Sequence, residues 1–223
     1  MKILLSVLLL TLFISSAFGQ DAVDRIPLCT NQTVEKISSR GIRLGMSIQE
    51  TLNLFAENNK LTAVNVSYPE NGGGANVTTS ELDFQSTLEK HREYAKKNFG
   101  FSLIRLSVKD KPNFDGISRY GLGFLDNRLA FFDVHYLKPK WESQEQFVRT
   151  MSEILNLPVR ENYLGGSPYS VKCGDYTARF YINYNDEARY SMSVSANVDE
   201  IVLQRRKKAE DEQREKDIKA FRP

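Results

Sequence analysis

The sequence predicts an α+β fold in which helices pack on an antiparallel β-sheet. Three observations lead to this prediction: capped helix starts, segments in which apolar and polar residues alternate, and short turns between neighbouring strands. Short turns join antiparallel strands, because a parallel pair needs a long crossover connection. The order of helix, strands, helix and strands also fits two related halves. A charged helix is expected at the C-terminal end.

The clearest helix start lies at Ser47, which is followed three residues later by Glu50. In this capping box the serine oxygen accepts a hydrogen bond from the Glu50 amide, and the Glu50 carboxylate accepts one from the Ser47 amide. Ile48, Leu52 and Phe55 then recur at the spacing of one helix face. The pattern predicts an amphipathic helix packed on the sheet.

Two more helices are expected, over 80–97 and from Ser143 onward. The first opens with Ser80 and Asp83 as candidate caps, and the second has Gln146 three residues after its cap. Both are expected to bury one apolar face against the sheet. The residues expected on these faces are Phe84, Leu88 and Ala95 in the first helix and Phe147, Met151 and Ile154 in the second.

Alternation of apolar and polar residues predicts the strands, which form a sheet with one polar face. The pair Asp126-Asn127 tolerates the left-handed backbone of a tight turn and is expected to join two of them in a hairpin. Two aromatic side chains, Phe131 and Tyr181, are expected at outward positions. The expected strands cover residues 62–68, 101–108, 120–124, 130–136, 176–184 and 190–196.

Residues 1–19 have the pattern of a secretory signal, with Lys2, an apolar run and a cleavage site expected between Gly19 and Gln20. The apolar run over 3–14 is shorter than the roughly 20 residues of a membrane helix, so no stable membrane insertion is expected. The protein is therefore expected outside the cytoplasm, either in the periplasm or secreted. The remaining parts are an N-terminal arm over 20–39, the α+β domain over 40–198 and a charged C-terminal helix over 199–223.

The formal charge of the 223-residue chain is +2, and loss of Lys2 with the signal would lower it by one. So small an excess predicts no strong attraction to nucleic acid or to anionic membranes. The basic block 205–208 is followed directly by acidic residues, as is typical of a solvated helix with charge pairs four residues apart. Nucleic acid is therefore not an expected partner.

Cys29 and Cys173 are the two cysteines of the chain. In an oxidising compartment they are expected to form a disulfide that ties the N-terminal arm to a late strand. Two unpaired thiols are the alternative. Neither cysteine belongs to a C-x-x-C motif, so a redox enzyme is not indicated.

The sequence offers few groups for catalysis. Its two histidines, His91 and His135, are too few for the usual zinc ligand sets, so no metal and no cofactor is expected. His135 is expected on the surface of a strand, and no G-x-S-x-G nucleophile elbow is present. Carboxylates such as Asp110 and Asp115 could meet in the folded chain, as glycosidase acids do. No catalytic residue is assigned, and an enzyme is unsupported rather than excluded.

One stretch near the start of the domain resembles a known family. The sequence IRLGMSIQETLNLF, from Ile42 to Phe55, resembles the G-M-(S/T)-x-x-(E/Q) helix opening of SmpA/OmlA-type bacterial envelope proteins and of β-lactamase-inhibitor-like helix-plus-sheet folds. Three later segments, GLGFLDNRLAFFDVHY, KPKWESQEQFVRTMSEILNLP and KAFRP, look like parts of uncharacterised bacterial exported proteins. The resemblance implies an exported α+β protein. Gln20, and not the lipid-anchored cysteine of that family, follows the expected cleavage site.

Together these observations favour a non-catalytic binding or interaction protein of the periplasm or extracellular space. Its partner is expected to be another envelope or extracellular protein, because the faces and edges of antiparallel sheets are ready surfaces for protein partners. The alternative is a secreted hydrolase that uses paired carboxylates brought together by the fold. The identity of the ligand and the oligomeric state are left open by the sequence.

Overall fold

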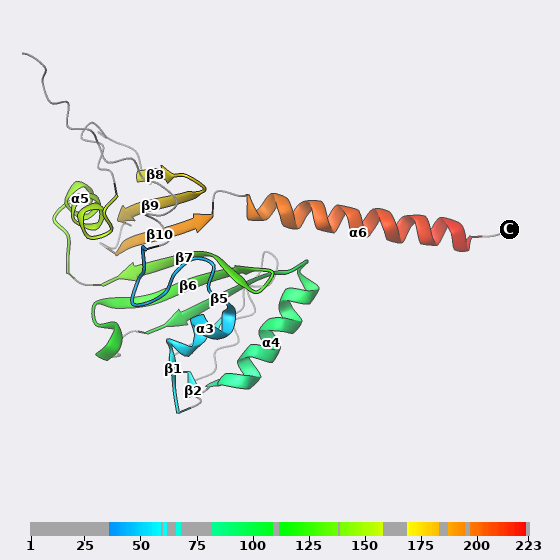
Figure 1. Ribbon diagram of the computed structural model, residues 1–223, viewed down its shortest axis with the longest axis horizontal. Coiled ribbons are helices and arrows are strands. Elements are labelled where there is room, and N and C mark those ends of the chain that lie inside the picture. The colour runs from blue at the N-terminus through cyan, green and yellow to red at the C-terminus, as the bar shows by residue number, and fades with distance from the viewer. Residues whose placement is uncertain are drawn as a thin grey trace, which may run out of the picture.

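The computed structural model describes residues 36–58, 60–61, 66–67, 82–108, 112–137, 139–157, 169–182, 187–194 and 197–221. These residues form an α+β fold, as predicted, with helices packed on antiparallel strands (Figure 1). The described helices are α3 (Ile48–Asn53), α4 (Phe84–Lys97), the short 3₁₀ helix η1 (Pro112–Phe114), α5 (Gln144–Ile154) and α6 (Val198–Ala220). The described strands are β1 (Ala56–Glu57), β2 (Lys60–Leu61), β3 (Val66–Ser67), β4 (Leu82–Asp83), β5 (Phe101–Ser107), β6 (Ile117–Leu125), β7 (Arg128–Tyr136), β8 (Tyr169–Cys173), β9 (Tyr176–Ile182) and β10 (Ala188–Val194).

The main sheet is antiparallel, with the described strands in the order β3-β5-β6-β7-β10-β9-β8. β6 and β7 form the predicted hairpin, and the two turn residues, Asp126 and Asn127, have positive φ angles of 51° and 62°. Positive φ at both central residues marks a type I′ turn, whose twist matches that of the flanking strands. β1, β2 and β4 form a second, small sheet.

The main sheet consists of two halves that meet at its centre. α4 leads into β5, β6 and β7, with β3 paired to the outer edge of β5, and α5 leads into β8, β9 and β10. β7 and β10 pair along the middle, with Phe132 opposite Met192 and Val134 opposite Tyr190. The alternating order of helices and strands is the one that the sequence predicted.

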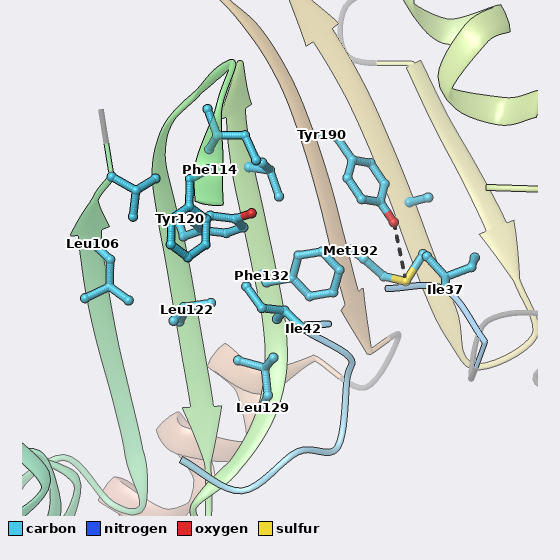
Figure 2. Close-up of a cluster of buried hydrophobic side chains, with 14 of the residues drawn as sticks. Ile37, Ile42, Leu106, Phe114, Tyr120, Leu122, Leu129, Phe132, Tyr190 and Met192 are labelled. Carbon is cyan, nitrogen blue, oxygen red and sulfur yellow. Dashed lines mark hydrogen bonds between the residues drawn. The ribbon is translucent and has the colours of Figure 1, made fainter. Parts of the chain in front are cut away.

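α4 and α5 contact side chains on the same face of the main sheet, here called the covered face. The ring of His91 on α4 lies 5.1 Å from that of Phe124, and the ring of Phe147 on α5 lies 6.1 Å from that of Phe180. Figure 2 shows the part of the resulting core to which β6, β7 and β10 contribute. The buried residues that the strands place on this face include Ser102, Ile104, Leu106, Tyr120, Leu122, Phe124, Phe132, Val134, Phe180, Tyr190 and Met192. Burial of this apolar surface is the main favourable contribution to folding.

Capping residues start the helices as predicted. The Ser47 amide donates to the Glu50 carboxylate at 2.7 Å, and the Glu50 amide donates to the Ser47 hydroxyl at 3.2 Å. α5 starts with a capping hydroxyl at Ser143. α4 is capped by Asp83, while the other candidate, Ser80, lies outside the described residues. Local hydrogen bonding therefore fixes where the helices begin.

Two predictions about the second half need correction. The prediction that Ile154 lies on the buried face of α5 is wrong, because its side chain is 69% exposed. The buried face includes Val148 and Ser152 and leaves Glu153 and Ile154 exposed to solvent. β8 was missing from the predicted strands, although its buried residues Tyr169, Val171 and Cys173 alternate with exposed ones.

Two arginines in the first half of α6, Arg205 and Arg206, hold it to the body, and the Arg206 guanidinium carbon lies 5.8 Å from the centre of the Phe99 ring. The Arg205 guanidinium donates to both carboxylate oxygens of Asp126, at 2.7 and 2.8 Å, and to the Phe99 carbonyl at 2.9 Å. Figure 1 shows the rest of the helix running away from the sheet. Ile218 and Phe221 near its end are exposed and do not pack on the described body. No described helix is both long enough and apolar enough to cross a membrane.

Candidate functional site

The face of the main sheet opposite the helices, here called the open face, carries the polar side chains of the central strands. Strand pairing arranges these side chains in rows that cross β5, β6, β7, β10 and β9. One row consists of Arg105, Gly121, Asp133, Ser191 and Arg179. The rows on either side of it are Ser107, Arg119, His135, Arg189 and Tyr181, and Leu103, Gly123, Phe131, Ser193 and Thr177. The outward positions predicted for Phe131 and Tyr181 are therefore confirmed.

Two glycines of β6 make room for larger residues of β7 on this face. A Cβ atom on Gly121 would collide with the Asp133 carboxylate, and one on Gly123 would collide with the Phe131 ring. Close approach of a neighbouring side chain is a common reason for glycine inside a strand. The carboxylate and the ring therefore lie flat over β6 instead of standing in solvent.

The prediction that His135 is a surface histidine is wrong. The residue does lie on the open face, but it is only 6% exposed because charged neighbours cover it. Its Nδ1 atom lies 3.1 Å from Nη2 of Arg119 and 3.2 Å from Oε1 of Glu187, and its Nε2 atom lies 3.4 Å from Oδ1 of Asp133. Because Nδ1 faces both a donor and an acceptor, the neutral and the protonated ring each find a partner there.

Asp133 connects this histidine to Arg189. The Arg189 guanidinium donates to the Asp133 carboxylate and to the Tyr181 hydroxyl, and its carbon lies 5.1 Å from the centre of the Tyr181 ring. Burial acts to raise the pKa of Asp133, but the hydrogen bond from His135 and the charge of Arg189 hold that pKa below its usual value. Asp133 is therefore an ionised carboxylate with partners on two sides.

Asp133 and Glu187 are two carboxylates that the fold brings to either side of His135. Burial acts to raise the pKa of Glu187 as well, but the neighbouring His135 and hydrogen bonding lower it below its usual value. A glycosidase with two acids needs one carboxyl group whose raised pKa keeps it protonated for the leaving group. The pKa values of Asp133 and Glu187 are both lowered, so neither carboxyl group matches that acid.

A hollow of about 540 Å³ lies on the open face beside the start of α6. Phe101 and Phe131 form its apolar side, with their rings stacked and their centres 6.5 Å apart. The other residues that line it are Asp133, Thr177, Arg179, Arg189, Ser191, Met192, Ser193, Val194, Asn197, Val198 and Asp199. Small hydroxyl side chains on β10 form part of its lining. A concave site with an apolar wall and a few polar groups is the usual form of a small-ligand site.

A serine and a histidine also meet on the covered face. The Ser102 hydroxyl oxygen lies 2.6 Å from Nε2 of His91, a distance at which a serine nucleophile and its base would sit. Both residues are buried where α4 packs on β5, with 1% and 0% of their surface exposed. Burial also lowers the pKa of His91 to about 3. A substrate has no access to this hydroxyl, so we interpret the pair as part of the core.

The remaining residues singled out in the sequence do not form a site in the described structure. Cys173 is buried at the end of β8, while Cys29 lies outside the described residues, so the disulfide between them stays a prediction. Asp110 also lies outside the described residues, and Asp115 is exposed in a turn. Within the described ranges, no group of three or more histidine, cysteine, aspartate or glutamate side chains is arranged to hold a metal ion.

Comparison of the chain with protein-family models, with curated proteins and with solved structures gives no match. The resemblance of residues 42–55 to SmpA/OmlA-type envelope proteins therefore stays a prediction.

Sequence reasoning missed the charged partners of His135. Its neighbours Arg119 and Arg189 come from β6 and β10, and Glu187 precedes β10 directly. A signal was present, because each arginine falls at an outward position of a strand with alternating pattern. The signal becomes readable only when the register between β7 and β10 is known, and a long connection separates these strands in the sequence.

Proposed function

We propose that the protein is a non-catalytic, extracytoplasmic binding protein and that its open face is the binding surface. One observation supports this most directly: helices fill the covered face, whereas the open face presents a hollow with aromatic, charged and hydroxyl groups. A ligand site needs this mixture of apolar wall and directional polar groups. The signal pattern of residues 1–19 supports a location outside the cytoplasm.

The proposed partner is another envelope or extracellular protein. Aromatic residues and arginine are enriched in the energetically important parts of protein interfaces. The open face offers both, because Phe131 and the exposed Arg179 line the hollow and Arg105 lies in the same row as Arg179. The charged network around His135 would give this surface a fixed shape before binding.

The proposal is tested by capture of partners from an envelope or extracellular extract with the purified protein as bait. The variant Arg179→Glu reverses one exposed charge on the open face, and Arg92→Glu reverses one on the exposed side of α4. We expect a saturable partner that is captured by the wild type and by Arg92→Glu but is lost with Arg179→Glu. The folded state of each bait is checked by thermal unfolding.

Three outcomes would contradict the proposal. The first is a partner that all three baits capture equally, and the second is no partner at all across growth conditions. The third is turnover of a small molecule by the purified protein that disappears in Asp133→Asn, since this result would make the buried carboxylate a catalytic group.

A further inference from the structure

We infer that the hollow on the open face binds an organic monocarboxylate with an adjoining apolar group, such as a small carboxylic acid or the C-terminal end of a polypeptide. The inference rests on the proposed function, because it names the chemistry of the group that the open face would bind. Three features of the hollow lead to it: a surplus of hydrogen-bond donors, an apolar wall and a single carboxylate, Asp199, that forms no ion pair with another described residue.

The donors lie on β9 and β10. No hydrogen bond or ion pair joins the side chain of Arg179, Ser191 or Ser193 to another described residue. Arg189 also borders the hollow, but its two terminal nitrogens already donate to Asp133 and Tyr181. The exposed guanidinium of Arg179 and the two hydroxyls beside it are thus available to an acceptor. A guanidinium matches the two oxygens of a carboxylate, which it binds with parallel hydrogen bonds.

The apolar wall lies next to these donors. Ser193 stands directly across from Phe131 in the pairing of β10 with β7, and the Phe131 ring stacks on Phe101. Ser191, one row along, stands across from Asp133 and beside Arg179. A ligand that places its carboxylate at Arg179 therefore lays the neighbouring part of its structure against the two rings. Aliphatic or aromatic groups gain most from such a position.

A carboxylate at the rim of the hollow favours a ligand with a single negative charge. Asp133 is already paired with Arg189 and His135, but Asp199 forms no ion pair with another described residue. Asp199 lies in the first turn of α6, where the helix dipole favours its negative charge. A second negative charge on the ligand would face this carboxylate. A monocarboxylate is therefore favoured over a phosphate dianion.

The test is a titration of the purified full chain, followed by amide NMR shifts. The probes are N-acetylphenylalanine, its uncharged amide and phenyl phosphate. We expect saturable shifts at Phe131, Thr177, Arg179 and Ser193 with the acid, and binding of the amide and of phenyl phosphate that is at least about tenfold weaker. Tenfold corresponds to the loss of one charge-assisted hydrogen bond.

Matched variants separate the hollow from the rest of the open face. Arg179→Gln is expected to weaken binding of the acid by about tenfold, whereas Arg105→Gln, which removes an arginine of the same row outside the hollow, should stay within about twofold. Ser193→Leu fills the hollow and leaves every charge in place, so it should abolish binding. Thermal unfolding confirms that each variant is folded.

The inference is overturned if the amide binds as well as the acid, if Arg179→Gln binds like the wild type, or if the acid gives no saturable shift. A second series identifies the source of the carboxylate. Pentapeptides that end in phenylalanine should bind more tightly than the single acid if a polypeptide end is the ligand, and no more tightly if a small acid is.

Failure here is distinguishable from failure of the proposed function. If a partner is captured through Arg179 but none of the carboxylate probes binds, the proposed binding function is kept. The inference that the hollow binds a carboxylate is then rejected. Saturable binding of the acid without any captured partner would support the hollow as a carboxylate site and contradict a protein partner.

Discussion

The two histidines of the chain lie on opposite faces of one sheet, and the groups that surround their rings differ. His91 lies on α4 against the covered face, with its Nε2 atom 2.6 Å from the Ser102 hydroxyl oxygen and its ring against that of Phe124. His135 sits on the open face, where Asp133, Glu187 and Arg119 contact its ring. Both side chains are buried, so burial alone does not distinguish them.

The two faces differ in how a buried polar group is stabilised. On the covered face the group stays neutral, because burial in apolar surroundings disfavours the charged ring and lowers the pKa of His91. On the open face charged groups are buried in pairs, and each member holds the next in place. The covered face is therefore suited to stability, and the open face to a fixed arrangement of charges beside a hollow. The predictions below test this contrast.

The largest effect is expected from a matched pair of phenylalanines. Phe132 and Phe131 are neighbours in β7, but Phe132 points into the core and Phe131 into the hollow. Phe132→Ala should lower the free energy of unfolding by about 3–5 kcal/mol, because it leaves a cavity. Phe131→Ala should lower it by no more than about 1 kcal/mol. Urea unfolding measures both, and equal losses would contradict the assignment of the two faces.

The next effect concerns the charged network. Asp133→Asn should lower the free energy of unfolding by about 2–3 kcal/mol at neutral pH, because it leaves Arg189 half-buried without its counter-charge. The exposed Asp115 offers a control, and Asp115→Asn should change stability by less than about 0.5 kcal/mol. If Asp133→Asn lowered the free energy of unfolding no more than Asp115→Asn does, the ion pairs of Asp133 would contribute no more to stability than exposed ones.

The same carboxylate gives this face an acid dependence with a definite sign. The pKa of Asp133 is lower in the folded state than its ordinary value of 3.8. Its ionised form therefore stabilises the fold above that value, and the stabilisation is lost as the pH falls through the lowered pKa. Unfolding curves of the wild type and Asp133→Asn should converge below about pH 4. Parallel curves down to pH 2 would contradict the pairing.

Protonation of the histidine on the covered face should lower the free energy of unfolding in a higher pH range than protonation of Asp133 does. The pKa of His91 falls from 6.5 to about 3 on folding, so between these values the unfolded chain binds a proton that the folded chain does not. The free energy of unfolding therefore decreases as the pH falls below 6.5, by about 2 kcal/mol at pH 5. His91→Leu should remove this decrease, whatever its effect at pH 7. A variant with the wild-type slope would show that the ring is protonated in the fold.

The contrast between the faces also explains what the sequence could predict. Alternation gave the correct face for Phe131, Tyr181 and His135, because it depends only on neighbours along one strand. The pairing of His135 with Arg119 and Glu187 depends on register between strands, which single-strand patterns do not contain. The sequence did not predict the hollow either, since the hollow requires Ser193 of β10 to lie across from Phe131 of β7. Helix starts were predictable for the opposite reason, because a capping box is complete within four residues.

The smallest effect is expected where α6 meets the sheet, at the edge of the hollow. Arg205→Gln removes the bidentate bond to Asp126 and the contact with the Phe99 carbonyl. Exposed ion pairs contribute little, so the global free energy of unfolding should fall by less than about 1 kcal/mol. Locally the change should be clear, because amide exchange over 198–206 should become faster as the helix start detaches.

Arg214 provides the control for this helix. It pairs with Asp211 at 2.6 Å on the projecting part of α6, which touches nothing else that the structure describes. Arg214→Gln should leave exchange over 198–206 unchanged. If both variants accelerated exchange there equally, helix fraying rather than detachment would be the cause, and the start of α6 would not be a fixed wall of the hollow. The open face would then be shaped by its strands alone.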